Sequence, residues 1–199
     1  MRRTFARFFA IGLMATVLAA SDAAAAETQA KPMKPALLVI DIQNAYLPMM
    51  SAEGKDSALY MINGAIELFR KNGFPIIRVH HTDPTYGPKP GTKEFEFPES
   101  VRIKPEDPQV VKNYPSAFKK TDLEKILKEK GCNTLFLCGL SAVGCVIATY
   151  YGANDLDYDT FMVRDALLSH NAEYTRVVQE ICNSVGYPAL KVMLENAKK

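Results

Sequence analysis

Residues 36–40 read ALLVI, five consecutive apolar side chains that are followed directly by Asp41. A run that is apolar at every position is typical of a strand covered on both faces, as in a parallel sheet. Similar runs recur further along the chain, at residues 75–79 (PIIRV), 134–137 (TLFL) and 160–163 (TFMV), with a shorter candidate at 110–111 (VV). The sequence therefore predicts a mostly parallel sheet.

The segments between these runs have the period of amphipathic helices. Leu59, Ile62, Ile66 and Phe69 share one helical face, and Gly73 supplies the stop. Further helices are expected after a capping box at residues 121–124, over a buried stretch at 146–153 and over an amphipathic stretch at 174–185. Strands that alternate with helices predict the α/β class, with a three-layer αβα sandwich around the mostly parallel sheet.

The N-terminus has the three parts of a secretory signal. Arg2, Arg3 and Arg7 carry positive charge, residues 8–20 are apolar, and a cleavage site of small residues follows. The alternative is a disordered start of a cytosolic protein. The expected division of the chain is a signal peptide at residues 1–26, a flexible lead-in at 27–34 and one folded domain at 35–199.

The signal predicts an exported protein, periplasmic or secreted. Arg2 and Arg3 also resemble the twin-arginine export motif, so the signal could direct the protein to the twin-arginine route or to the ordinary secretory route. Loss of residues 1–26 removes three arginines and one aspartate, which changes the formal net charge from +2 to 0. A neutral mature chain gives no reason to expect nucleic acid as a partner, and no membrane contact is expected after cleavage.

The four cysteines are too few and too irregularly spaced for a disulfide scaffold. No pair has the C-x-x-C spacing of a structural zinc site or a thioredoxin-like motif. Three of them, Cys132, Cys138 and Cys182, are expected to be buried small side chains.

Three reactive side chains are expected at one edge of the sheet. Asp41 ends the first strand, Lys112 follows residues 110–111, and Cys145 lies a short loop beyond the strand that starts at Thr134. Ligands of open α/β sheets bind outside the carboxyl ends of the strands. A helix start and the Lys112 ammonium would favour the Cys145 thiolate, while Asp41 could act as general base and then general acid.

Each of these residues also has an ordinary structural interpretation. A cysteine at an apolar helix start often fills the core, an aspartate at a strand end often forms a turn, and a lysine is usually solvated. The prediction of a site therefore depends on the three sharing one edge.

Three blocks of sequence resemble the signature blocks of isochorismatase-like cysteine hydrolases. They are residues 36–47 (ALLVIDIQNAYL), 110–118 (VVKNYPSAF, with TDL at 121–123) and 138–149 (CGLSAVGCVIAT), in the order and spacing of that family. Weaker matches are Gly91–Thr92 and Asp165–Ala166. The resemblance covers residues 35–170 and implies the isochorismatase-like αβα fold.

The resemblance also implies a site and a reaction. Asp41, Lys112 and Cys145 take the places of the family's catalytic triad, which attacks an amide or related carbonyl, releases ammonia or an amine, and hydrolyses the resulting thioester. A cis peptide would join Leu140 to Ser141 and aim the backbone N–H groups of Ser141 and Cys145 at the oxyanion. The family's members are commonly dimers or larger homo-oligomers, and the partner is a small-molecule substrate.

The chain departs from the family's nicotinamidases at their metal site. Those enzymes carry an Asp-x-His pair after the second strand, where this chain reads His80–His81–Thr82. Adjacent histidines on an extended chain point to opposite sides, so we expect no metal at this place. No other cofactor is expected. The residues before the nucleophile, Ser141–Ala142, lack a threonine that many members have.

The remaining predictions concern the pocket. Tyr46, Tyr114 and Phe118 lie near the three catalytic positions and line an apolar pocket or, equally, pack in the core or at a subunit contact. His170 follows the fifth strand and could reach the site, although a lone histidine there is more often structural. Residues 81–107 form a long loop expected to be an active-site wall or a subunit contact, with a plain surface excursion as the alternative.

Two other functions stay open. True isochorismatases cleave a vinyl ether and can work without the thiol, so Cys145 favours amide hydrolysis over a vinyl ether or ester hydrolase in the same pocket. The second alternative is a non-catalytic protein that binds a ligand or senses oxidation through Cys145.

Overall fold

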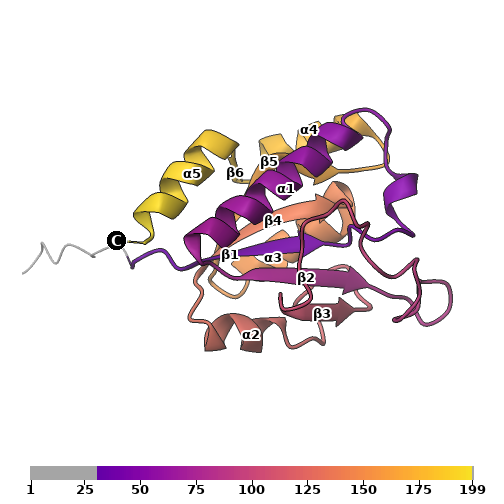
Figure 1. Ribbon diagram of the computed structural model, residues 1–199, viewed down its shortest axis with the longest axis horizontal. Coiled ribbons are helices and arrows are strands. Elements are labelled where there is room, and N and C mark those ends of the chain that lie inside the picture. The colour runs from indigo at the N-terminus through magenta and orange to yellow at the C-terminus, as the bar shows by residue number, and fades with distance from the viewer. Residues whose placement is uncertain (1–30, 199) are drawn as a thin grey trace, which may run out of the picture. The chain divides into compact units, whose positions relative to one another are not determined.

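A computed structural model describes residues 31–198 of the chain (Figure 1). The predicted signal peptide, the twin-arginine motif and the first residues of the lead-in lie outside the described residues. The last part of the lead-in is held to the domain, since the Lys34 N–H donates to the Asn133 side chain and the Pro32 carbonyl accepts from it. No helix within residues 31–198 is both long and apolar enough to cross a membrane.

Six strands form one sheet in the order β3-β2-β1-β4-β5-β6, and every neighbouring pair is parallel. Their bounds are Pro35–Ile40 (β1), Ile76–His81 (β2), Gln109–Lys112 (β3), Thr134–Leu140 (β4), Asp159–Leu168 (β5) and Ser184–Val185 (β6). All residues of β1 and β4 are buried, as their uninterrupted apolar runs predict. The predicted parallel sheet is confirmed.

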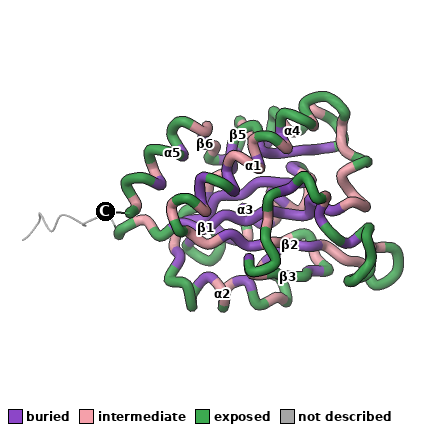
Figure 2. Tube along the Cα trace, in the orientation of Figure 1, coloured by how far each residue is buried: buried purple, intermediate pink, exposed green. Residues whose placement is uncertain are grey.

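Five α-helices and two short turns complete the described part of the chain. They are α1 (Lys55–Asn72), α2 (Leu123–Glu129), α3 (Ile147–Asn154), α4 (Ala172–Ile181) and α5 (Tyr187–Asn196), with a 3-10 turn at Leu47–Met49 and a π-helical turn at Ala142–Val146. Core residues of α1 and α5 pack on one face of the sheet, and those of α2 and α3 pack on the other. Figure 2 shows the buried strands between helices with exposed outer faces. The predicted three-layer αβα sandwich is confirmed.

Two local predictions are wrong. The helix expected over residues 174–185 ends at Ile181, because the backbone of Cys182 is extended. Beyond it, Val185 belongs to β6 and pairs with Val163 of β5. The capping box before α2 does not form: the Thr121 hydroxyl accepts from the Leu123 N–H, while Glu124 bonds to Lys128 within the helix. The helix starts at Leu123, too late for Thr121 to be its N-cap.

The long segment between β2 and β3 packs against the loop that follows β1. The carbonyls of Glu94 and Glu96 accept the N–H groups of Ala45 and Asn44. At its end, the buried Asp107 carboxylate accepts two hydrogen bonds from the Arg70 guanidinium, at 3.0 and 2.9 Å. Such ties favour the active-site wall over a plain surface excursion, because the segment supports residues that border Asp41.

Candidate active site

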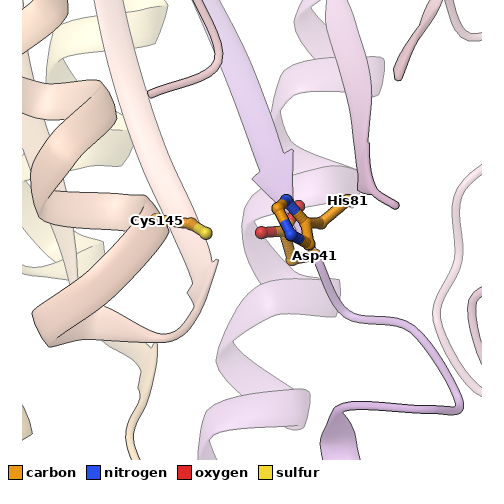
Figure 3. Close-up of side chains that lie close together, drawn as sticks. All are labelled: Asp41, His81 and Cys145. Carbon is orange, nitrogen blue, oxygen red and sulfur yellow. The ribbon is translucent and has the colours of Figure 1, made fainter. Parts of the chain in front are cut away.

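The site lies where the chain's path through the sheet reverses. From the centre of the sheet, β1, β2 and β3 follow one another toward one edge, and β4, β5 and β6 toward the other. In such a fold, ligands usually bind in the crevice between the two central strands, here β1 and β4. Asp41 directly follows β1, and Cys145 lies in the turn after β4. Figure 3 shows the Cys145 sulfur facing the Asp41 carboxylate, with the His81 ring beside it.

Lys112 reaches this crevice from two strands away. It ends β3 and lies in register with His81 on β2, and its fully buried side chain extends past β2 to Asp41. Its Nζ lies 2.7 Å from Asp41 Oδ2 and 3.1 Å from His81 Nδ1. A buried ammonium needs such partners, because an unpaired charge in this environment costs several kcal/mol. The structure therefore brings Asp41, Lys112 and Cys145 together, as the sequence predicts.

Asp41 is held in an unusual backbone conformation. Its φ of 55° lies in the left-handed region, which aspartate tolerates better than most residues. Its N–H donates to the Val79 carbonyl, and its carbonyl accepts from the Gln43 N–H. The side chain is buried, and Oδ1 has no hydrogen-bond partner in the described part of the chain. One carboxylate oxygen is thus fixed by Lys112 while the other keeps an open acceptor.

Gly139 allows β4 to approach the end of β1 closely. Its φ is 122°, and a Cβ atom at this position would lie 2.1 Å from the Ile40 carbonyl oxygen. Any side chain would force the two strands apart immediately before Asp41. The glycine therefore sets the spacing between the strand that carries the carboxylate and the strand that leads to the thiol.

The nucleophile candidate lies in a tight turn. The peptide bond between Leu140 and Ser141 is cis, as the family resemblance implies. The N–H groups of Gly144 and Val146 both donate to the Ser141 carbonyl, so the backbone folds back on itself around Cys145. Cys145 is half-buried within this π-helical turn, which continues directly into α3. The turn brings the predicted oxyanion donors, Ser141 and Cys145, into one compact segment.

The protonation state of the site differs from expectation. Burial raises the pKa of Asp41, and the charge and hydrogen bond of Lys112 oppose this shift. Burial, together with the Asp41 charge, raises the pKa of the Cys145 thiol to about 12, and Lys112 only partly offsets this. Burial and the adjacent carboxylate therefore outweigh the Lys112 ammonium and disfavour the expected resting thiolate. A raised thiol pKa makes a base close to the sulfur useful for removing its proton.

His81 is the site residue that sequence reasoning left unassigned. The buried Gln43 side chain fixes it, accepting from the His81 N–H at 2.7 Å and donating to its carbonyl at 3.0 Å. Burial and the Lys112 charge lower the pKa of His81 to about 4, so its ring is neutral. The available signal was its position at the carboxyl end of a strand, on the face opposite His80.

His80 lies on the other face of β2 and belongs to the core. Its ring stacks between Phe95 and Phe97, with centroid distances of 4.8 and 4.4 Å. Burial, with a smaller contribution from Arg78, lowers the pKa of His80 to about 4. The prediction that the two histidines point to opposite sides is confirmed.

The donor atoms of Asp41, His81 and Cys145 lie within 4.8 Å of one another, a spacing that could hold a metal ion. The Lys112 ammonium, however, already contacts both the Asp41 carboxylate and the His81 ring. A second cation here would face an adjacent positive charge with no added carboxylate to balance it. The donor set therefore does not fit a metal.

Of the three predicted pocket residues, Tyr46 lies beside the site. Its ring centroid is 5.9 Å from that of His81, and burial, aided by the charge of Asp41, raises its pKa to about 12. The Tyr114 ring instead lies beneath the ammonium groups of Lys119 and Lys120.

The other aromatic and histidine candidates lie in different surroundings. Phe118 packs against the core and the Tyr158 ring, which supports packing over lining. His170 is exposed and contacts the Tyr174 ring. The remaining cysteines are buried and none forms a disulfide, as expected: Cys132, Cys138 and Cys182.

Comparisons with known proteins agree with this fold. The Isochorismatase domain family matches residues 35–183. The isochorismatase family protein YddQ of Bacillus subtilis is 36% identical over 141 residues, which cover 67% of this chain and 77% of that protein. Maleamate amidohydrolase of Pseudomonas putida is 28% identical over 156 residues, covering 67% of this chain and 72% of the enzyme.

A solved structure from Burkholderia xenovorans, described as an isochorismatase, superposes with a TM-score of 0.75 at 23% identity, covering 84% of this chain and 90% of that one. Such similarity shows the fold. Together with the matching family, which spans most of the described chain, it leads to one conclusion. The chain belongs to the isochorismatase family, within the isochorismatase-like cysteine hydrolase superfamily, and has that family's hydrolase fold.

Proposed function

We propose that this protein hydrolyses the C–N bond of a small amide through a thioester on Cys145. The observation that supports this most is that the two oxygens of the Asp41 carboxylate have different surroundings. Lys112 holds Oδ2 at 2.7 Å, while Oδ1 is buried without a partner among the described residues. The Cys145 sulfur lies within 4.8 Å of the same carboxylate. A carboxylate with a raised pKa beside a protonated thiol suits proton transfer in both directions.

In the first half-reaction, the thiol proton passes to Asp41 as the sulfur bonds to the amide carbon. The carbonyl becomes an oxyanion, for which the backbone N–H groups of Ser141 and Cys145 are the proposed donors. Asp41 then returns the proton to the amide nitrogen, the C–N bond breaks, and ammonia or an amine leaves. Lys112 keeps the carboxylate in place and balances its charge throughout.

In the second half-reaction, water attacks the thioester carbon and gives one proton to Asp41. The C–S bond breaks, the sulfur takes the proton back from Asp41, and a carboxylic acid is released. The site therefore returns to its resting state, with a neutral thiol and an ionised carboxylate. No cofactor is needed for either step.

Similarity and chemistry favour this reaction over the alternatives. One relative is named a maleamate amidohydrolase, an enzyme that acts on an amide bond. A vinyl ether or ester hydrolase in the same pocket would release no nitrogen compound, so product analysis separates the two. A non-catalytic ligand-binding or thiol-sensing protein would show binding or reversible oxidation of Cys145 without turnover, so ammonia release separates it from the hydrolase.

The test is ammonia release from a panel of small amides, ureido acids and hydroxamates. We expect turnover by the wild type and its loss in Cys145→Ala, with the fold retained. Cys182→Ala is the matched control, because it removes another buried thiol outside the site. Ammonia release that persists in Cys145→Ala would rule out the thioester route.

We also propose that the protein is exported and works as a homo-oligomer, a dimer or larger, on a small-molecule substrate. The support for export is the signal-like sequence at residues 1–26. Mass spectrometry of the mature protein would locate the cleavage, expected after Ala26, and light scattering would give the oligomeric state.

A further inference from the structure

The Lys112 ammonium makes two short contacts that constrain the His81 ring. An ammonium group has three N–H donors and no lone pair. In its contact with His81 Nδ1 at 3.1 Å, Lys112 must therefore donate and the imidazole nitrogen must accept. The other short contact, to Asp41 Oδ2, directs the ammonium between the two partners.

This contact determines which ring nitrogen of His81 carries the proton. Burial and the Lys112 charge keep the ring neutral above its pKa of about 4. A neutral imidazole with an accepting Nδ1 carries its single proton on Nε2. Within residues 31–198 this nitrogen is not one of the buried side-chain atoms that lack a partner, and the His81 residue is only half-buried. One ring nitrogen of His81 lies within 4.8 Å of the Cys145 sulfur, so the ring borders the place where a substrate would react.

Both the backbone and the neighbours of His81 fix the direction of this donor. The Gln43 side chain bonds to the His81 N–H and carbonyl, and the Tyr46 ring lies against the imidazole. The donor is thus preorganised, so that binding an acceptor requires little loss of side-chain freedom.

We propose, building on the amide hydrolysis above, that His81 positions Lys112 through Nδ1 and binds the substrate through Nε2–H. The substrate class that follows is a small amide carrying a second oxygen acceptor, a carbonyl or carboxylate, near the scissile bond. An amide without that acceptor leaves the Nε2–H desolvated and unpaired, which disfavours its binding.

Two substitutions separate the two tasks. His81→Asn keeps an oxygen acceptor near the place of Nδ1 and removes the Nε2–H. His81→Gln places an amide donor near Nε2 and removes the Nδ1 acceptor. His170→Asn is the matched control, because His170 is an exposed histidine whose ring contacts the ring of Tyr174.

The probes are succinamate, which carries a carboxylate, and butyramide, its apolar counterpart. We expect His81→Asn to lose about tenfold of the kcat/KM preference for succinamate over butyramide, the lower end of what one hydrogen bond to a charged group contributes. His81→Gln should lower kcat on both substrates and keep the preference. An unchanged preference in His81→Asn would overturn the proposal that Nε2–H binds the substrate. An unchanged kcat in His81→Gln would overturn the proposal that Nδ1 positions Lys112.

A turnover-independent measurement keeps this proposal distinct from the proposed function. The ¹⁵N shifts of His81 in the resting wild-type protein report its tautomer directly. The Nε2–H tautomer, persisting down to acidic pH, is the expected result. The Nδ1–H tautomer would overturn the proposal even if amides are hydrolysed, whereas failure to hydrolyse any amide while the Nε2–H tautomer is found would overturn only the proposed function.

Discussion

His80 and His81 are consecutive residues of β2, yet they have opposite surroundings. The His80 ring stacks between Phe95 and Phe97, and its Nε2 is buried without a partner among the described residues. The His81 ring contacts Lys112 and borders the crevice with Asp41 and Cys145. The strand places successive side chains on opposite faces, so one step along the chain changes core into site.

The comparison teaches that a lowered pKa alone does not mark a functional histidine. Burial lowers the pKa of both rings to about 4. What differs is the surroundings of the ring: Phe95 and Phe97 enclose His80, whereas His81 contacts the buried Lys112 ammonium and is only half-buried. Substitutions can therefore change activity on one face of β2 and stability on the other.

The largest expected effect on the site face is that of Asp41→Asn. Loss of the base should lower turnover by about 10³-fold, a typical value for general acid–base catalysis. The same change should speed iodoacetamide labelling of Cys145 at mildly alkaline pH, because the Asp41 charge raises the thiol pKa. Full activity in this variant would contradict the acid–base role, and slower labelling would contradict the electrostatic one.

On the core face, His80→Ala should lower the free energy of unfolding by about 2–4 kcal/mol, because it empties the space between two phenyl rings. His80→Leu should restore most of that loss at neutral pH, since it fills the space and removes a buried, unpartnered N–H. Denaturant unfolding measures both. Turnover per folded molecule should stay at the wild-type level, and a fall comparable to that of a His81 variant would erase the contrast between the faces.

The smallest expected effect is in the pH dependence of stability. Both histidines have a pKa lowered from the ordinary 6.5 to about 4, so the unfolded chain binds protons that the folded chain does not. The contribution of the two neutral histidines to the free energy of unfolding is therefore fully present above pH 6.5. It declines as the pH falls toward about 4. His80→Leu should show a shallower decline than the wild type in thermal unfolding at a series of pH values. Identical slopes would mean that His80 does not contribute.

Much of the fold could be predicted from local sequence. The uninterrupted apolar run before Asp41 indicated a strand buried on both faces, and Gly73 ends α1 at φ 74° as expected. The two-residue strand β6 could not be predicted, because Ser184 and Val185 are too few to show a period and only their pairing with β5 defines them.

The candidate site was predicted in part. Asp41, Lys112 and Cys145 each follow or end a strand, which was enough to expect them at one edge. His81 was not assigned to them, since its role depends on the length of the Lys112 side chain and on the neighbouring position of β2 and β3. Phe118 was equally placed between pocket and core, and only its contact with Tyr158 distinguished the two.

The sequence by itself determined the alternation of strands and helices, the parallel sheet and the three reactive residues at its carboxyl edge, because periodicity and strand ends are local properties. Only the tertiary structure determined the protonation of the site. The pKa of the Cys145 thiol depends on burial and on the distances to one carboxylate and one ammonium, and these groups are far apart along the chain. Electrostatic energies follow separation in space and exclusion of water, neither of which a linear pattern records.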